Sequence, residues 1–278
     1  MKDIFAGLDR PDWAIEPEDA CERAGAFIRQ VLDDSGLPNL VIGLSGGIDS
    51  AVSAGLAARA VGADRVRGFL LPYATSSAAS LSDATAVAET LGIAHETVPI
   101  TPMADTFLAD IPADQRVRRG NVMARCRMIV LYDRSAAHQA LVLGTGNRTE
   151  ALLGYTTMYG DNACALNPLG QLYKTEVRLL SAWLGLPRSV LEKAPSADLW
   201  EGQADEDELG FSYAEADRLL HEMIDNGRDA AALAERGFAA PLVERVSTRV
   251  RAMRFKRQGP PVAVMPGRPD PDRDGGPR

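Results

Sequence analysis

Short apolar runs alternate with helix-forming segments through the first half of the chain. The runs have the length and composition of buried strands and lie at residues 39–44, 65–72, 95–100 and 140–146. Helical periodicity marks the segments 49–62, 80–92 and 121–138, and a further helix is predicted over 16–36. Strands that alternate with helices pair in parallel through helical crossovers. The sequence therefore predicts an α/β fold, a doubly wound parallel sheet of the Rossmann-like kind.

The second half of the chain is predicted to be mostly helical. Apolar residues recur at helical spacing over residues 171–185, 212–225 and 242–257. The segment PSADLWEGQADEDELG, between the first two of these helices, is acidic and has no evident apolar face. It fits either a mobile lid, at about 198–211, or a solvated connector. Residues 259–278 are rich in proline and glycine and are expected to be disordered, which leaves a single domain over 1–258.

The overall charge argues against two classes of partner. The 278 residues carry a net charge of −8, so a nucleic acid or an anionic membrane surface would repel the chain as a whole. No apolar stretch is long enough to span a bilayer, and the N-terminal MKDIFAGLDRPDW lacks the pattern of a signal peptide. We therefore expect a cytoplasmic protein that binds neither nucleic acid nor membrane.

The three cysteines do not form a recognisable pattern. Cys21, Cys126 and Cys164 lie far apart, are odd in number and include no C-x-x-C pair. Such spacing is not typical of a disulfide framework or a zinc site. We expect reduced thiols.

A glycine-rich turn follows the first predicted strand. In SGGIDS, at 45–50, two glycines lie between strand and helix, where bare backbone and helix-start amides can approach a phosphate. The lysine of the usual nucleotide P-loop is absent, and Asp49 stands in the turn instead. A carboxylate next to a phosphate repels it unless a divalent cation lies between them, so Asp49 indicates Mg²⁺ bound to a polyphosphate. Taken alone, Asp49 is equally well explained as a first-turn acid that favours the helix dipole.

The order of motifs resembles that of a known enzyme family. SGGIDS resembles the pyrophosphate loop of the ATP pyrophosphatase superfamily, the adenine nucleotide alpha hydrolase-like proteins. The rest of the chain, from about Ala20 to Pro261, resembles the ammonia-dependent NAD synthetases. The stretches that carry this resemblance are GNVMARCRM (120–128), LVLGTGNRTEALLGY (141–155), YGD (159–161), NPLGQLYKTEVR (167–178), PSADLWEGQADEDELGFSY (195–213) and KRQGPP (256–261).

The resemblance implies a two-step ligase reaction. A carboxylate is adenylated by ATP with release of pyrophosphate, and ammonia then converts the acyl-adenylate to an amide and AMP. Asp49 and Glu150 are implied as the Mg²⁺ ligands, and Asp49, Asp161 and Lys174 as catalytic residues. Asp161 would lie near the reacting carbon and orient ammonia or accept its proton. The implied ATP contacts are Gly43, Leu44, Ser45, Gly46, Gly47, Ile48, Asp49, Ser50, Thr145, Lys174 and Ser196.

The acceptor side departs from the family pattern. The family positions that bind deamido-NAD correspond here to Arg125, Met158, Ala165, Phe255 and Lys256. The family has lysine at position 158, aspartate at 165 and histidine at 255, and it has glycines in place of Asn162 and Ala163. Several polar contacts are thus missing, and each is worth about 1–3 kcal/mol. We expect weakened binding of deamido-NAD or a different carboxylate.

Three functions therefore remain open from the sequence. Amidation of deamido-NAD to NAD is the first, and amidation of another carboxylate in a specialised pathway is the second. The third is a catalytically silent nucleotide-binding homologue, against which the presence of both metal-binding acids argues. By resemblance we also expect a homodimer, and a separate glutaminase is a possible source of ammonia.

Overall fold

The computed structural model describes residues 5, 7–196, 198–200, 202–263 and 265–267. Its centre is a four-stranded parallel sheet in the order β3-β2-β1-β4. The strands are β1 (Asn39–Gly43), β2 (Val66–Leu70), β3 (Ala94–Thr97) and β4 (Ala140–Val142). The chain runs outward from β1 through β2 to β3 and then returns to the other side of β1 as β4. The predicted doubly wound parallel sheet is confirmed.

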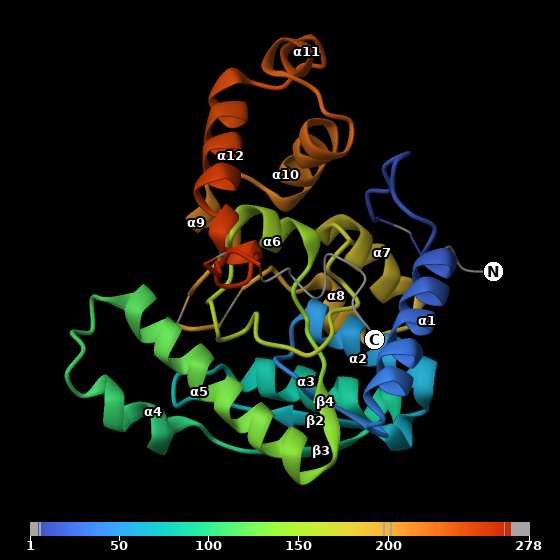
Figure 1. Cartoon of the computed structure of the whole chain (residues 1–278), viewed down its shortest axis with the longest axis vertical. Helices are drawn as coiled ribbons and strands as arrows, with labels where there is room; N and C mark the ends of the chain where they lie inside the picture. Colours follow the sequence, from blue (N-terminus) through green and yellow to red (C-terminus); the bar gives the residue numbers. More distant parts are fainter. Residues whose placement is uncertain (1–4, 6, 197, 201, 264, 268–278) are drawn as a thin grey trace.

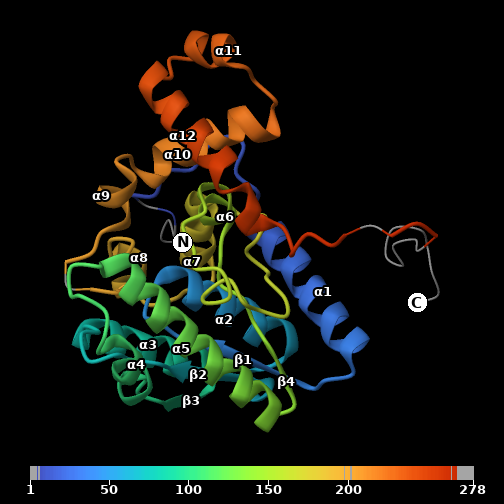
Figure 2. The same cartoon turned by 60° about the vertical axis from the view of Figure 1, so that its left-hand side comes forward.

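Helices cover both faces of this sheet (Figures 1 and 2). On one face lie α1 (Pro17–Ser35), α2 (Ile48–Val61), α3 (Ala78–Leu91), α7 (Lys174–Trp183) and α8 (Arg188–Glu192). On the other face lie α4 (Thr101–Leu108) and α5 (Arg116–Ala137). Leu40 and Ile42 of β1 pack on the first face and Val41 on the second, because side chains alternate along a strand. Burial on both faces explains the continuous apolar runs.

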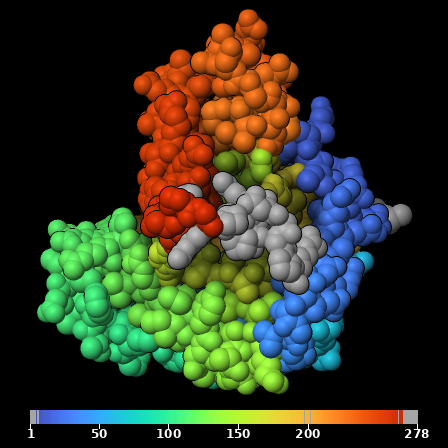
Figure 3. All heavy atoms as spheres, in the orientation of Figure 1, coloured from blue at the N-terminus to red at the C-terminus, as the bar shows by residue number. Residues whose placement is uncertain are grey.

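The remaining helices form a lobe above the sheet layer, of which the part after residue 204 is coloured orange to red in Figure 3. They are α6 (Arg148–Leu153), α9 (Asp205–Leu209), α10 (Tyr213–Leu220), α11 (Ala230–Glu235) and α12 (Ala240–Ala252). One turn of π-helix (His221–Asp225) extends α10, and a 3-10 turn (Arg254–Arg257) follows α12. Their apolar faces share one core that includes Leu153, Leu219 and Val246. The predicted C-terminal helices are present, and the short α4, α6, α8, α9 and α11 were not predicted.

The segment between α8 and α10 differs in part from its sequence interpretation. The expectation that it lacks an apolar face is wrong at its end, because Leu209 of α9 is buried in the core of the lobe. Asp205, which begins α9, is buried as well. Residues 197 and 201 lie outside the described residues, as do 264 and 268–278 of the predicted tail. Residues 259–263 and 265–267 contain no helix or strand.

All three cysteines are free thiols. Cys21 and Cys126 are buried, and Cys164 is partly buried. This agrees with the expectation from their spacing. Among the described residues, no helix has the length and apolar character needed to cross a membrane.

Candidate active site

The glycine-rich turn lies between β1 and α2, as the sequence predicts. The Oγ atoms of Ser45 and Ser50 are 3.1 Å apart, and the amide of Gly47 donates to Ser45 Oγ at 3.1 Å. Gly46 has φ +75°, and a Cβ added there would lie 2.2 Å from the carbonyl oxygen of Ser80. Glycine is therefore required at position 46 twice over, by backbone conformation and by close packing against the start of α3.

The loops that follow β1 and β4 meet at the point where the strand order reverses. β1 and β4 are hydrogen-bonded neighbours, and ligands of open α/β sheets bind beyond the carboxyl ends of such strands. Asn147 caps α6, since its Oδ1 accepts from the amide of Glu150 at 2.9 Å. Its Nδ2 donates to Asp49 Oδ1 at 2.8 Å. One asparagine thus ties together the two loops that carry the predicted metal-binding acids.

Lys174 joins these two acids. Its Nζ donates to Asp49 Oδ2 at 2.5 Å and to Glu150 Oε1 at 3.1 Å, and it lies 5.0 Å from the ring centroid of Tyr213. Lys174 is only 3% exposed. The sequence alone allowed a surface lysine at this position, and the structure excludes that alternative. Asp49, Glu150 and Lys174, which are 125 positions apart at most, form one cluster.

Burial and mutual charge shift the ionisation of this cluster. Burial and the neighbouring carboxylate of Asp49 raise the pKa of Glu150 above its ordinary value, while Lys174 acts in the opposite direction. Burial alone would lower the pKa of Lys174, but the carboxylates of Asp49 and Glu150 outweigh it and raise that pKa. Lys174 therefore stays protonated and donates to both acids.

Buried hydrogen bonds fix the backbone that carries Lys174. The amide of Lys174 donates to Thr149 Oγ1 at 3.0 Å, and the amide of Thr175 donates to Asp217 Oδ2 at 2.8 Å. Glu176 closes the start of α7 by accepting from the amide of Tyr173 at 2.8 Å. These bonds join α6, α7 and α10, so the position of Lys174 depends on the lobe as well as on the sheet.

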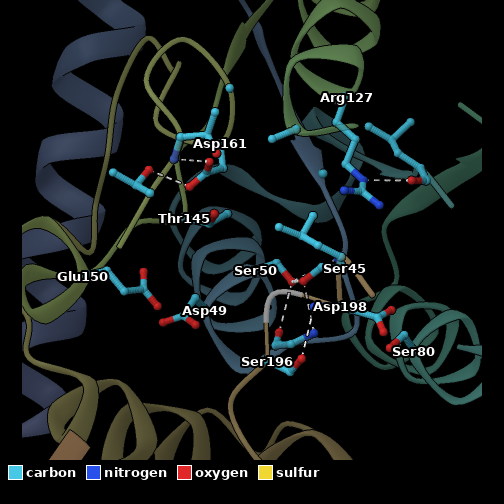
Figure 4. Close-up of a pocket in the computed structure, with 18 of the residues that line it drawn as sticks. Ser45, Asp49, Ser50, Ser80, Arg127, Thr145, Glu150, Asp161, Ser196 and Asp198 are labelled. Carbon is cyan, nitrogen blue, oxygen red and sulfur yellow. Dashed lines mark hydrogen bonds between the residues drawn. The ribbon is translucent and has the colours of Figure 1, made fainter. Parts of the chain in front are cut away.

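A cavity of about 670 Å³ opens above the cluster. The predicted residues that line it are Gly43, Leu44, Ser45, Gly47, Ile48, Asp49, Ser50, Thr145, Glu150, Asp161, Lys174, Ser196 and Lys256. Figure 4 shows Asp49 and Glu150 facing one another, with the serine pair beside them and Asp161 on the far side of Thr145. The predicted residues that do not line it are Gly46, Arg125, Met158, Ala165 and Phe255.

On the acceptor side, a loop and the end of the lobe approach each other. Asp161 accepts hydrogen bonds from the amide of Thr157 at 2.7 Å and from Thr156 Oγ1 at 2.5 Å. Lys256 Nζ donates to the carbonyl oxygens of Gly154 and Thr156 at 2.8 and 2.6 Å. From the sequence, Asp161 could have been an ordinary turn residue. In the structure it lines the cavity.

The predicted residues outside the cavity are mostly on the surface. Arg125 is exposed, and its guanidinium donates to the carbonyl oxygen of Met158 at 3.1 Å. Ala165 is exposed, and Phe255 is 55% exposed. These positions, predicted as acceptor contacts, lie away from the cavity of this single chain.

Comparison with known proteins gives the family. The family model for NAD synthase matches residues 20–260. The NH(3)-dependent NAD(+) synthetase of Pelodictyon phaeoclathratiforme is 50% identical over 87% of this chain and 88% of its own length. The chain belongs to the NAD synthase family.

Two solved structures resemble the chain in three dimensions. The NMN synthetase from Francisella tularensis aligns with a TM-score of 0.78 and 34% identity, over 91% of this chain and 99% of its own. The NH3-dependent NAD synthetase from Campylobacter jejuni, solved with a nitrate ion, aligns with a TM-score of 0.77 and 33% identity, over 90% and 100%. The fold and the family thus agree with the expectations from the motifs.

The carboxylate pair of this NAD synthase family member fits a magnesium ion. Within the described part of the chain, no group of three or more His, Cys, Asp or Glu side chains is arranged to hold a metal. Nucleotide-bound Mg²⁺ takes only one or two protein carboxylates, and phosphate oxygens and water complete its shell. Asp49 and Glu150, both at the cavity wall and both within reach of Lys174 Nζ, match that donor set.

Sequence reasoning missed several cavity residues. Lys193 Nζ donates to Ser80 Oγ and to Asp83 Oδ2, each at 3.0 Å, so it joins α3 to the end of α8. Arg127 also lines the cavity. The sequence held a sign of this, because residues two positions apart on a helix are rotated by about 200° around its axis and so point in nearly opposite directions. Only one of Arg125 and Arg127 can face the cavity, and it is Arg127.

Proposed function

We propose that the chain is an ammonia-dependent NAD synthetase. It would adenylate the carboxylate of deamido-NAD with ATP and transfer ammonia to it, giving NAD, AMP and pyrophosphate. The names of the most similar relatives support this reaction. The cluster of Asp49, Glu150 and Lys174 beside the glycine-rich turn carries the proposal, because a silent homologue has no need of two acids held around a buried lysine.

The first step would take place over the glycine-rich turn. A carboxylate oxygen attacks the α-phosphorus of ATP, and the bond to the bridging oxygen of the β-phosphate breaks. Mg²⁺ held by Asp49 and Glu150 would neutralise phosphate charge and orient the leaving group. Lys174 supplies a further positive charge where the pyrophosphate develops. Ser45 and Ser50 hold the turn in shape through their mutual hydrogen bond.

The second step would take place next to Asp161. Ammonia attacks the carbonyl carbon of the acyl-adenylate, and the bond between that carbon and the oxygen of AMP breaks. Because Thr156 and Thr157 donate to its carboxylate, Asp161 is held as an acceptor that can orient ammonia and take the proton it loses. Lys256 supports this loop through the carbonyl oxygen of Thr156.

A lid over residues 198–211 is part of the proposal. Asp198 Oδ2 accepts from the amide of Ser77 at 3.4 Å, and Asp205 accepts from the hydroxyls of Tyr155 and Tyr213 at 2.9 and 3.2 Å. Closure would exclude water from the acyl-adenylate. Amide hydrogen exchange across this segment should slow when ATP, Mg²⁺ and acceptor are added. Unchanged exchange would contradict the lid.

A second candidate is amidation of the corresponding mononucleotide. The similarity to a protein described as an NMN synthetase favours it, as do Met158 and Ala165, which replace charged family residues. A smaller acceptor would need fewer polar contacts outside the cavity.

A pyrophosphate-release assay separates these functions. Deamido-NAD, nicotinic acid mononucleotide and no acid would each be supplied with ATP, Mg²⁺ and ammonium. Release with deamido-NAD supports the first function, and release with the mononucleotide alone supports the second. No acid-dependent release in either case would support the silent homologue.

We also propose a homodimer in the cytoplasm, supplied with ammonia directly or by a separate glutaminase. Light scattering in solution would test the dimer. Comparison of ammonium with glutamine as nitrogen source would test the need for a glutaminase, because glutamine alone should support little turnover.

A further inference from the structure

Arg127 is a positively charged residue of the cavity that has no role in the proposed reaction so far. The basic side chains that line the cavity, among the residues described, are those of Arg127, Lys174, Lys193, Arg249 and Lys256. Lys174 and Lys193 are paired with carboxylates. Arg249 and Lys256 are held by carbonyl oxygens of residues 153–156, at the base of the lobe. Arg127 stands apart from both groups, on α5.

The guanidinium of Arg127 is anchored at one nitrogen. Its Nε donates to the carbonyl oxygen of Leu71, just beyond β2, at 3.0 Å. No other hydrogen bond or ion pair of Arg127 occurs within the described residues. An arginine carries five N–H donors and cannot lose its charge in a protein, so both Nη groups keep donors for an anion. Burial lowers the pKa of Arg127, and the carboxylates of Asp198 and Asp161 act in the opposite direction.

The position of Arg127 points to one reacting group. In Figure 4 the serine pair lies between Arg127 and the acid pair of Asp49 and Glu150. Asp161 is near enough to Arg127 for its carboxylate to act on the pKa of the guanidinium. The polyphosphate would be served by the acid pair and Lys174. The acceptor carboxylate and the α-phosphate are two anions that repel each other at close range, and Arg127 is a cation of the same cavity that lies apart from the acid pair. Bidentate hydrogen bonds from a guanidinium suit a carboxylate.

We propose that Arg127 binds the carboxylate of the acceptor and holds it for attack on ATP. This rests on the proposed function, since it names the group that orients that function's acceptor. It also gives the site a means to reject the product. The amide formed in the reaction has no negative charge, so the contact that holds the substrate is lost when the amide forms. Arg127 thus selects carboxylate over amide.

Binding measurements test this selection without turnover. Calorimetry would compare deamido-NAD with NAD, which differ only as carboxylate and amide, in the presence of Mg²⁺ and α,β-methylene-ATP to block adenylation. The wild-type protein should bind the carboxylate more tightly. Arg127→Met should lose about 10- to 100-fold in affinity for the carboxylate and at most about threefold for the amide and for the ATP analogue. Arg127→Lys, which keeps the charge, should retain part of the preference.

Arg118→Met is the matched control. Arg118 lies on the same helix, is exposed and donates to Gln115 Oε1 at 3.2 Å. This control should leave all three affinities within about twofold, and thermal melting should show that each variant is folded. Equal losses of carboxylate and amide affinity in Arg127→Met would assign Arg127 a structural role. A loss of affinity confined to the ATP analogue would show that Arg127 binds the nucleotide instead. Either result overturns the proposal.

The proposed function is tested separately. If the wild-type protein binds deamido-NAD but releases no pyrophosphate, the proposed function is wrong. The role of Arg127 is then still decided by the binding comparison. Wild-type protein that binds neither the carboxylate nor the amide would end both.

Discussion

The two sides of the cavity are built in different ways. The phosphate side, formed by residues 43–50, Glu150 and Lys174, lies on the carboxyl ends of β1 and β4 and on the helices that follow. The acceptor side consists of the loop of residues 154–165 and the 3-10 turn after α12, which contribute Tyr155, Asp161 and Lys256 to the cavity wall. The first is fixed by sheet register and buried hydrogen bonds, and the second by a few contacts near the surface.

This difference bears on how the family can vary. A parallel sheet allows its strand ends little freedom, so the positions of the residues on the phosphate side are set by the fold. Loops tolerate substitution far better. The changes at Met158, Ala165 and Phe255 all fall on the tolerant side. Reaction class is therefore expected to be robust in this chain, and acceptor preference is expected to be open to change.

The largest expected effect is on the acid pair of the phosphate side. Asp49→Asn or Glu150→Gln removes a proposed metal ligand, which is worth several kcal/mol in the transition state. Acid-dependent pyrophosphate release should fall by about 10²- to 10³-fold in each variant. Asp19→Asn, an exposed acid on α1, is the control and should keep normal turnover. Near-normal turnover of both acid-pair variants would remove the pair from the mechanism, and unfolding of either would favour a structural role.

The next effect separates backbone conformation from close packing. Gly46→Ala places a Cβ 2.2 Å from the carbonyl oxygen of Ser80, whereas Gly36→Ala, at a similar positive φ, meets nothing within 4 Å. Both should lose about 1–2 kcal/mol of stability from the left-handed conformation. Only Gly46→Ala should also weaken ATP binding, by at least about tenfold, since the turn must move to avoid an atom of the backbone. Equal ATP affinities in the two variants would show that the turn adapts.

A smaller effect is expected on the acceptor side. Met158→Lys combined with Ala165→Asp restores the charged residues of the family. It should lower the KM for deamido-NAD by about tenfold and leave the KM for ATP unchanged, because each charged contact is worth about 1–3 kcal/mol. Steady-state kinetics with each substrate varied would measure this. An unchanged KM for deamido-NAD would locate acceptor selection in the residues that line the cavity.

The smallest effect concerns the framework behind Lys174. Asp225 accepts from Tyr173 Oη at 2.9 Å and from Arg148. Partial burial acts in the opposite direction, but these hydrogen bonds lower the pKa of Asp225. A lowered carboxyl pKa stabilises the fold above about pH 4 and loses that contribution as pH falls through the lowered value.

Asp225→Asn should therefore cost about 1 kcal/mol at pH 7, and the gap to the wild type should narrow below pH 4. Thermal melting at pH 7 and pH 3 measures the gap. A gap of the same size at both values would mean that the charge of Asp225 contributes nothing.

The phosphate side could be predicted from the sequence because its residues adjoin strong local signals. SGGIDS and GTGNRTE each follow an apolar strand, and the carboxyl ends of parallel strands meet at one edge. Lys174 was placed by its motif alone, and the sequence could not exclude a surface position. Its burial depends on Tyr213 and on bonds to α6 and α10, which are distant in sequence.

The acceptor side could not be predicted to the same depth. Residues 154–165 have no period that assigns a side chain to a face, and Tyr159 adopts φ +58°, which few residues other than glycine do. Arg127 was missed because its anchor, the carbonyl oxygen of Leu71, is 56 positions away. In the helical sequence ARCRM (124–128), the spacing shows that only one of the two arginines can face the cavity, but it does not show which one.

Oxygen transfer from the acceptor is the most direct test of the proposed reaction. Deamido-NAD labelled with ¹⁸O in both carboxylate oxygens would be converted with ATP, Mg²⁺ and ammonium. Mass spectrometry would then measure the ¹⁸O content of each product. Attack of the carboxylate on the α-phosphorus predicts one ¹⁸O in the phosphate of AMP, one in the amide of NAD and none in pyrophosphate. Label in inorganic phosphate together with ADP, or in pyrophosphate, would contradict adenylation and with it the assigned roles of the phosphate side.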